Sequence, residues 1–458
     1  MSVLTGIARP LTTPTTAPPP SRARRHLAHW WPLAPAVAPV LLLAVPLSYG
    51  NGSTTSTNVS VADMASAFLV LFCAVRLLRR RARPLTPAAA VVLGAPAVGI
   101  AVATVTAGDP FAALPGFVRY LQIFVLIPAA VVLLLRDARD FRVVAASFVV
   151  LAVIQGGFGV YQYATRSGAS YRGSDIRAVG TFGATDVMGM ATVVAYGLVI
   201  ATAIALRPAR GAPRRLRPVA IGAAAALIVP LALSFSRGSW IATLLAGLAV
   251  VLCAGFRKAS RVLPAAVALG VVLVGGFGVG TQLIQQRVSS ITQVTDAPDQ
   301  SVTDRYTMWA AAVRMWRAEP VTGVGLKGFP AHRDGDASLG LSSGSDTEGA
   351  GRGYQRQPLL SPHNMYLLVL SEQGLLGATV LIGSWAALLV GAVRRLVAAR
   401  RSRDAAEDCG LVAAGLMIWQ SVDFLYGDIG GPSTVLSGIV FGLVAWWALA
   451  GPKTSSGV

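Results

Sequence analysis

Apolar runs of about 20 residues dominate the chain, and short polar or arginine-rich segments separate them. An α-helix needs about 20 apolar residues to cross a bilayer. The pattern therefore predicts twelve transmembrane helices, at residues 32–49, 61–78, 87–107, 114–135, 141–163, 186–206, 217–235, 238–256, 262–281, 364–390, 409–426 and 432–450. Only the sequence SFSRGSW (234–240) separates the seventh helix from the eighth, which predicts a tight helical hairpin.

Composition agrees with a membrane protein. The 458 residues are 54% hydrophobic and only 13% charged, and the mean hydropathy is +0.61. A net charge of +19 is compatible with nucleic-acid binding. The basic residues, however, gather in every second connection between apolar runs, which is the distribution of cytoplasmic loops. We therefore expect a lipid bilayer around the chain and no nucleic-acid partner.

The same charge distribution predicts the orientation, with both termini in the cytoplasm. We divide the chain into a disordered cytoplasmic segment (1–31), nine transmembrane helices (32–281), a long extracytoplasmic loop (282–361), three further helices (362–450) and a cytoplasmic tail (451–458). Residues 1–31 lack a small-residue cleavage site, so we expect no cleaved signal peptide.

The long loop begins with an amphipathic pattern. One helical face would carry Arg305, Trp309, Ala312, Val313 and Trp316. Such a helix lies on the membrane surface or packs over the bundle. The Gly/Ser-rich residues 334–356 are either a mobile flap or a linker.

Four arginines on the extracytoplasmic side call for an explanation, because charges beside or inside an apolar helix are costly. Arg237 lies at the tip of the predicted hairpin, and Ser236 and Ser239 beside it supply hydroxyl groups. Arg237 either reaches to lipid headgroups or binds a phosphate. For Arg305, the alternative to a binding role is an ion pair with a nearby acid. For Arg177, the alternative is that it is an ordinary loop arginine. The remaining one, Arg119, lies inside the fourth helix, where Asp63 or Asp423 is a possible partner.

The stretch SPHNMYLLVLSEQGLLG (361–377) joins the loop to the tenth helix. Ser361 is the expected N-cap with Pro362 at the first helical position, so His363 and Asn364 would lie in the first turn. Tyr366 recurs at helical spacing from His363. A near-neutral pKa makes His363 a candidate general base, whereas Glu372 is expected to be a buried, paired or protonated carboxyl. Neither the four histidines nor the three cysteines form a metal-binding or disulfide pattern.

Four segments together resemble the O-antigen ligase/O-antigen polymerase superfamily. HNMYLLVLSEQGLLG (363–377) matches the pattern HNxYLxxLxExGLxG, and SRGS (236–239) matches a Ser-Arg hairpin motif. Arg305 and Trp309 precede PVTGVG (320–325), and RAVGTFG begins at Arg177. One departure is the sequence ATD (184–186), where the family usually has an asparagine.

The resemblance implies an all-α, GT-C-like polytopic membrane enzyme with about 12 transmembrane helices and a long extracytoplasmic loop. It implies inverting, metal-independent glycosyl transfer without a cofactor. The donor would be a glycan linked to undecaprenyl diphosphate, and the acceptor a glycan or glycolipid. By motif, His363 would be the base and Arg237 and Arg305 would bind the diphosphate. We expect further substrate contacts from Arg177, Arg119, Asn364, Tyr366, Ser236 and Ser239.

The motifs do not separate a ligase from a polymerase of glycan repeats, although the strongest one favours a ligase. A 12-helix secondary transporter is an alternative, but the two halves of the sequence show no repeat. A structural membrane scaffold is the third possibility. It predicts that Arg237 and His363 are dispensable.

Overall fold

The computed structural model describes residues 31–46, 60–80, 85–171, 173–255, 300–338 and 340–450, with the single residues 257, 260 and 264. Three predicted segments lie outside the described residues: 1–31 except Trp31, the ninth helix 262–281 except Pro264, and the tail 451–458.

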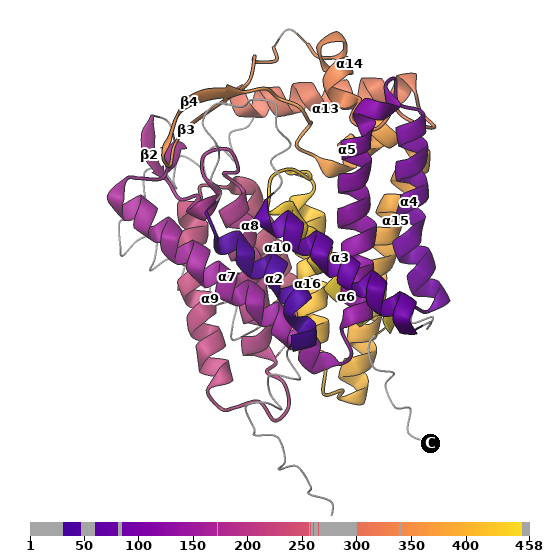
Figure 1. Ribbon diagram of the computed structural model, residues 1–458. Helices are drawn as coiled ribbons and strands as arrows, with labels where there is room; N and C mark the ends of the chain where they lie inside the picture. Colours follow the sequence, from indigo (N-terminus) through magenta and orange to yellow (C-terminus); the bar gives the residue numbers. More distant parts are fainter. Residues whose placement is uncertain are drawn as a thin grey trace, which may run out of the picture.

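Helices form a bundle in which most members share one direction, while α3 and α7 cross it obliquely (Figure 1). Eight helices among the described residues are long and apolar enough to span a membrane. The chain therefore has the fold of a multi-pass membrane protein, and the count of twelve stays a prediction. The elements of the bundle are η1 (Trp31–Leu33), α2 (Ala34–Leu41), η2 (Leu42–Ala44), α3 (Val61–Arg80), α4 (Pro87–Val105), α5 (Pro110–Leu121), η3 (Gln122–Leu126), α6 (Ile127–Leu134), α7 (Ala138–Thr165), η4 (Gly180–Phe182), α8 (Gly189–Leu206), α9 (Leu216–Leu233), α10 (Arg237–Ala254), α15 (Met365–Ser402), α16 (Glu407–Asp423), α17 (Thr434–Ala445) and η5 (Trp446–Ala450).

Small residues allow the helices to pack closely. A Cβ added to Gly415 of α16 would lie 2.8 Å from Val199 of α8 and 2.6 Å from Val250 of α10. A Cβ on Gly99 of α4 would lie 2.9 Å from the backbone of Gly377 in α15. Close backbone approach of this kind is the main source of helix association in a lipid environment.

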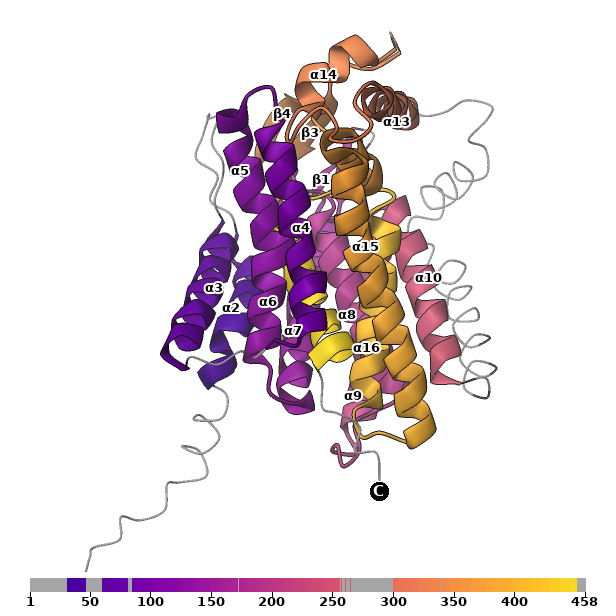
Figure 2. The same cartoon turned by 90° about the vertical axis from the view of Figure 1, so that its right-hand side faces the viewer.

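The two ends of the bundle differ. Helices α13 (Gln300–Ala318) and α14 (Phe329–Asp336) and a small sheet cover one end, which we call the sheet end (Figures 1 and 2). The opposite end carries ion pairs between helix termini: Arg142–Asp408 at 2.7 Å, Arg207–Glu407 at 3.4 Å and Arg400–Glu407 at 3.6 Å.

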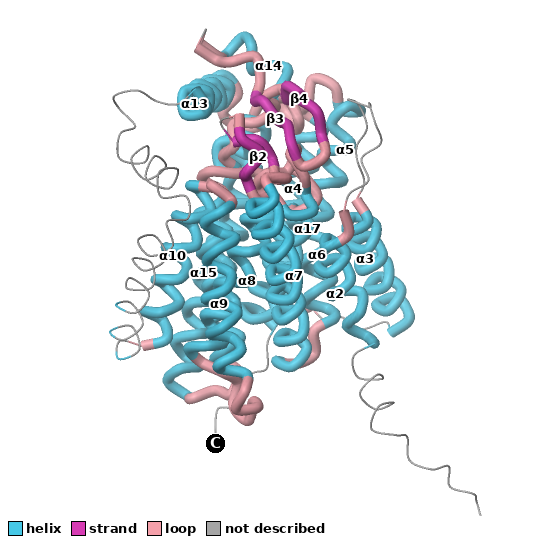
Figure 3. The backbone as a smooth tube through the Cα atoms, turned by 90° about the vertical axis from the view of Figure 1, so that its left-hand side faces the viewer, coloured by secondary structure: helices cyan, strands magenta, loops and turns pink. Residues whose placement is uncertain are grey.

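Four strands lie over the sheet end (Figure 3). They are β1 (Ala169–Tyr171), β2 (Ser174–Arg177), β3 (Ser345–Gly349) and β4 (Arg352–Gln357), in the antiparallel order β2-β1-β3-β4. The prediction of helices alone is thus incomplete. Residues 334–356, expected to be a flap or a linker, contribute the end of α14, strand β3 and most of β4.

Helix α13 confirms the predicted loop helix, and it packs over the bundle. Its buried residues are turned by about one position from the predicted face, because the helix packs against α15 and α14. They are Asp304, Thr307, Met308, Ala311, Ala312 and Met315.

Helix α15 runs the length of the bundle but is broken at Gly374, which has φ 61° and ψ −165° (Figure 2). The loop after α13 fills the break. Leu375 N–H donates to Pro320 O at 2.9 Å and Leu376 N–H to Val321 O at 3.1 Å. In return, Ser371 O accepts from Val324 N–H at 2.9 Å. The PVTGVG segment therefore provides hydrogen-bond partners for the backbone groups that the break deprives of their helical partners. Backbone groups inside a membrane need such partners, because no water is present there to replace them.

Because of this arrangement, alanine substitutions of Gly374 and of Gly383 in the same helix should affect the melting temperature differently. A Cβ on Gly374 would lie 2.6 Å from Gly323 N, and its positive φ costs about 1–2 kcal/mol for an L-residue. Gly383 has open space around its Cβ position. We expect Gly374→Ala to lower the melting temperature in detergent, and Gly383→Ala to leave it unchanged or raise it, because alanine favours a helix. Equal effects would contradict the account of the break.

Candidate functional site

Three helix ends and one turn meet at the sheet end. Trp309 of α13 donates its indole N–H to Pro362 O at 2.9 Å, directly before His363. Met365 N–H, at the start of α15, donates to Phe424 O at 2.8 Å and Gly427 O at 3.0 Å. The turn 424–428 in this way joins α16 to the start of α15.

The same turn reaches the start of α10. Gly238 lies so close to it that an added Cβ would be 2.9 Å from the Cβ of Tyr426. Residues 237, 305, 363 and 428 therefore come from four separate parts of the chain that are packed together.

His363 has a strained backbone. Its φ is +48°, a conformation that non-glycine residues rarely adopt and that often occurs at functional sites. Asn364 is the N-cap of α15, and its side chain accepts from Leu367 N–H at 3.1 Å. The prediction that Ser361 caps the helix is wrong. The left-handed turn at His363 delays the helix start, so the histidine projects from a loop.

Arg237 is the first residue of α10. Ser236 is the N-cap and accepts from Ser239 N–H at 3.4 Å, and the two serine hydroxyls lie 3.0 Å apart. Both serines are buried. They build the turn from which the arginine extends, and Phe235 before them has φ +51°.

Three further residues that we expect to contact the substrate each have a partner within the protein. Arg177 Nε donates to Ser234 O at 3.0 Å, beside the start of α10. Arg119 forms an ion pair with Asp63, which was one of its two predicted partners. The Tyr366 hydroxyl donates to Ser421 O at 2.8 Å and joins α15 to α16.

Neighbouring charges within the site change the pKa values of Arg305 and His363. Burial and the positive charge of Arg237 lower the pKa of Arg305, against opposing effects of Asp428, Asp423 and Tyr426. Burial also lowers the pKa of His363; Asp428 acts to raise it and Arg305 to lower it. The site therefore combines two adjacent cations with an imidazole that is neutral near pH 7.

Asp428 was missed in the sequence. One of its carboxylate oxygens, Oδ2, is buried and has no hydrogen-bond partner within the described part of the chain. The available signal was an acid in the polar connection DFLYGD (423–428), between two apolar runs. Asp423 was considered only as a partner for Arg119, but its charge acts on Arg305.

The RAVGTFG segment forms the turn η4, which two glutamines of α7 hold in place. Gln162 Oε1 accepts from Val179 N–H at 3.0 Å and Gly180 N–H at 2.9 Å. Gln155 Oε1 accepts from Thr181 N–H at 2.9 Å. The motif thus has a structural role here. In the departure at 184–186, the Asp186 carboxylate accepts from Ser433 Oγ at 3.2 Å.

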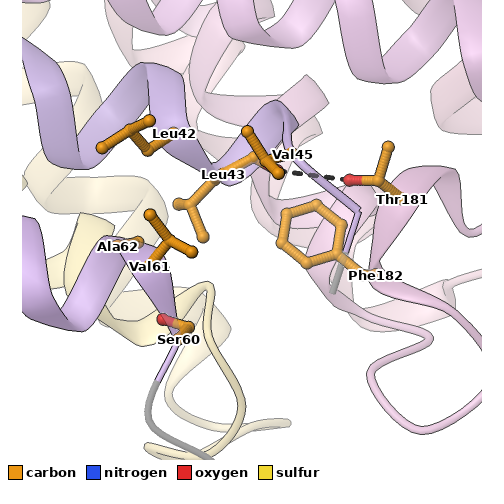
Figure 4. Close-up of a pocket in the computed structure, with 8 residues that line it drawn as sticks. All are labelled: Leu42, Leu43, Val45, Ser60, Val61, Ala62, Thr181 and Phe182. Atoms are coloured by element: carbon orange, nitrogen blue, oxygen red, sulfur yellow. Dashed lines mark hydrogen bonds between the residues drawn. The ribbon is translucent and has the colours of Figure 1, made fainter. Parts of the chain in front are cut away.

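A small, mostly apolar pocket lies beside this turn (Figure 4). The Thr181 hydroxyl donates to Leu43 O at 3.2 Å at its edge. The pocket contains none of the predicted catalytic residues; its lining comprises Leu42, Leu43, Val45, Ser60, Val61, Ala62, Thr181 and Phe182.

Glu372 lies apart from these interactions, 1% exposed inside α15. Its Oε1 accepts from Phe329 N–H at 3.3 Å. This contact fits the expected buried carboxyl and holds the start of α14 against α15. Among the described residues, no group of three His, Cys, Asp or Glu side chains could hold a metal ion.

Comparison with known families supports the motif assignment. The family model described as O-antigen ligase matches residues 222–382. This range contains three of the four motifs, those at Arg237, Arg305 and His363. The match confirms the relationship to the O-antigen ligase superfamily. No curated protein matches the chain.

The N-cap geometry gives a test of what Asn364 does. Asn364→Ala should reduce the free energy of unfolding by about 1 kcal/mol, because the cap of α15 is lost. Asn364→Ser retains a capping oxygen and should keep nearly all of the stability. Thermal unfolding in detergent measures both. A serine variant of normal stability that still fails to turn over substrate would show that Asn364 also contacts the substrate.

Proposed function

We propose that the protein transfers a glycan from undecaprenyl diphosphate to a hydroxyl group of a glycan or glycolipid acceptor, in the manner of an O-antigen ligase. The transfer would take place at the extracytoplasmic face of the cytoplasmic membrane, with both termini cytoplasmic. The observation that carries the proposal is the meeting of Arg237, Arg305 and His363 at the sheet end. Membership of the superfamily supports it.

The two arginines suit a diphosphate leaving group. As the bond between the anomeric carbon and the phosphate oxygen breaks, negative charge develops on the diphosphate. Guanidinium groups bind phosphate oxygens through paired hydrogen bonds and can stabilise that charge without a metal ion. Besides burial, the charge of Arg237 lowers the pKa of Arg305, so the two cations repel each other. A bound dianion would relieve this repulsion.

His363 suits the acceptor side. Its lowered pKa leaves the imidazole neutral near pH 7 and able to accept a proton. The acceptor oxygen would attack the anomeric carbon and give its proton to His363, while undecaprenyl diphosphate departs. A single displacement of this kind inverts the anomeric configuration. The Asp428 charge would stabilise the imidazolium ion that forms.

A polymerase of glycan repeats would use the same groups, since it differs in the acceptor and not in the bond that is made. The size of the product separates the two: a ladder of repeats indicates a polymerase, and a single addition indicates a ligase. A transporter has less support, because the paired arginines lie at one end of the bundle and not near its middle.

The first test is glycan transfer by purified protein in detergent, with EDTA and an undecaprenyl-diphosphate glycan as donor. A general base contributes about 100- to 10,000-fold, so His363→Ala should lower kcat by that factor. His332→Ala is the matched control, since His332 is exposed and its ring lies 2.9 Å from Gly328 O. That variant should keep wild-type activity. Full activity in His363→Ala would remove the proposed base.

Asp428 provides a test through pH. Its negative charge raises the pKa of His363, so Asp428→Asn should lower that pKa further. The acidic limb of the kcat/KM profile reports the pKa of the base in the free enzyme. The limb should therefore move to lower pH in the variant, even if the maximum rate also falls. A shift to higher pH, or none, would mean that Asp428 does not act on the catalytic base.

A further inference from the structure

We propose that the outer face of the four-stranded sheet binds the sugar chain of the donor, beyond the diphosphate. The inference rests on the proposed function, and it assigns a binding surface to residues outside the motifs. The surface consists of Tyr354, Arg356 and Asp346, which we call the Tyr354 surface.

The sheet is attached to the turn that carries Arg237. The rings of Tyr171 in β1 and Phe235 stack with centroids 5.0 Å apart and an interplanar angle of 6°. Ala178 N–H, just after β2, donates to Leu233 O at 3.1 Å. Phe235 and Leu233 lie within four residues of Arg237, so the sheet and the arginine are parts of one packed unit.

Strand pairing shows which side chains share one side of the sheet, and their exposure shows that this side is open to solvent. Ala169 and Tyr171 of β1 are buried, and Ala169 pairs with Gly349 of β3. The pairing of β3 with β4 shifts register between Thr347 and Gly349, so exposure decides the side, and the Asp346 side chain is 58% exposed. Asp346 pairs with Arg356 of β4 and therefore shares that outer side with it.

Contacts between the side chains confirm this arrangement. The Tyr354 hydroxyl donates to Asp346 Oδ1 at 2.8 Å, and Arg356 lies 3.3 Å from the same oxygen. Tyr354 is nevertheless 59% exposed. The ring is held in one orientation while its face remains open to solvent.

This combination matches the chemistry of a sugar chain. An exposed aromatic ring offers an apolar face for the C–H groups of a sugar, with a polar hydroxyl at its edge. The guanidinium and the carboxylate beside it can bond to sugar hydroxyls. Since the three side chains already contact one another, binding would cost little additional side-chain ordering.

The donor is the occupant that the connectivity favours. A sugar chain attached to a diphosphate at Arg237 begins beside the unit to which the sheet belongs. The acceptor hydroxyl must instead reach His363, whose backbone is held by α13 and by the turn 424–428. Strand β4 also leads to His363, through residues 358–362, so an acceptor chain is the competing occupant, and a dependence of KM on acceptor length would assign the surface to it.

The test compares two donors, undecaprenyl diphosphate carrying one sugar and the same lipid carrying several glycan repeats, with one acceptor. Tyr354→Ala should raise KM about tenfold for the long donor, equivalent to about 1.4 kcal/mol. It should leave kcat and the KM of the short donor unchanged. Gln355→Ala, on the opposite side of the same strand, is the matched control and should change neither value. Tyr354→Trp retains an aromatic ring and should restore most of the affinity.

Equal losses with both donors, or with Gln355→Ala, would mean a general structural effect and overturn the proposal. So would a KM change that depends on acceptor length. Binding of the water-soluble glycan released from the donor, followed by saturation-transfer NMR, needs no catalysis. The protein could bind the glycan in a Tyr354-dependent manner and yet show no transferase activity. That result would retain this surface as a binding site and reject the proposed function. Normal transfer by Tyr354→Ala with both donors would retain the proposed function and reject this surface as a binding site.

Discussion

The site depends on the hydrogen bonds between the broken helix α15 and the loop after α13. Gly374 interrupts the helix, and Pro320, Val321 and Val324 provide the backbone partners that the helix lacks there. A loop peptide inserted into a transmembrane helix cannot leave without exposing unpaired polar groups in an apolar environment. The insertion therefore places the segment outside the bundle in a defined position relative to α15. The further bond from Leu326 N–H to Ala103 O, at 2.8 Å, extends this attachment to α4.

That attachment helps to position the residues of the candidate site. Helix α13 directly precedes the inserted loop, and Trp309 on it holds Pro362. His363 follows with a backbone conformation that is unfavourable in isolation. Its position is thus determined by contacts on both sides: α13 before it, and the turn 424–428 that accepts from Met365 after it. A histidine held in this way would require little reorganisation to act as the proposed base.

The sequence pointed to Arg237 and Arg305 because a charge beside apolar residues is costly, and to His363 because of its near-neutral pKa and its motif. The structure brings these three parts of the chain together. The sheet was not predicted because its inner pair, Ala169 with Gly349, joins two hairpins that are remote in sequence and individually short and polar. The break at Gly374 was missed because glycine is common in transmembrane helices and nothing local marks its positive φ. Asp428 was missed since its significance depends on the fold of a turn far from the other motifs.

The motifs contain two kinds of residue: charged residues, and residues whose hydrogen bonds keep the neighbouring turns and helix ends in position. Ser236 and Asn364 are N-caps, and the GTFG turn is held by Gln155 and Gln162. Sequence similarity alone gives these residues the same weight as the arginines. The contrast with the opposite end of the bundle is informative, because there Arg142 is paired with Asp408 within 2.7 Å. At the sheet end Arg305 lies in the electrostatic field of a second cation, Arg237, as well as in that of Asp428 and Asp423. Two cations brought close together in this way suit the diphosphate anion that the proposed function requires.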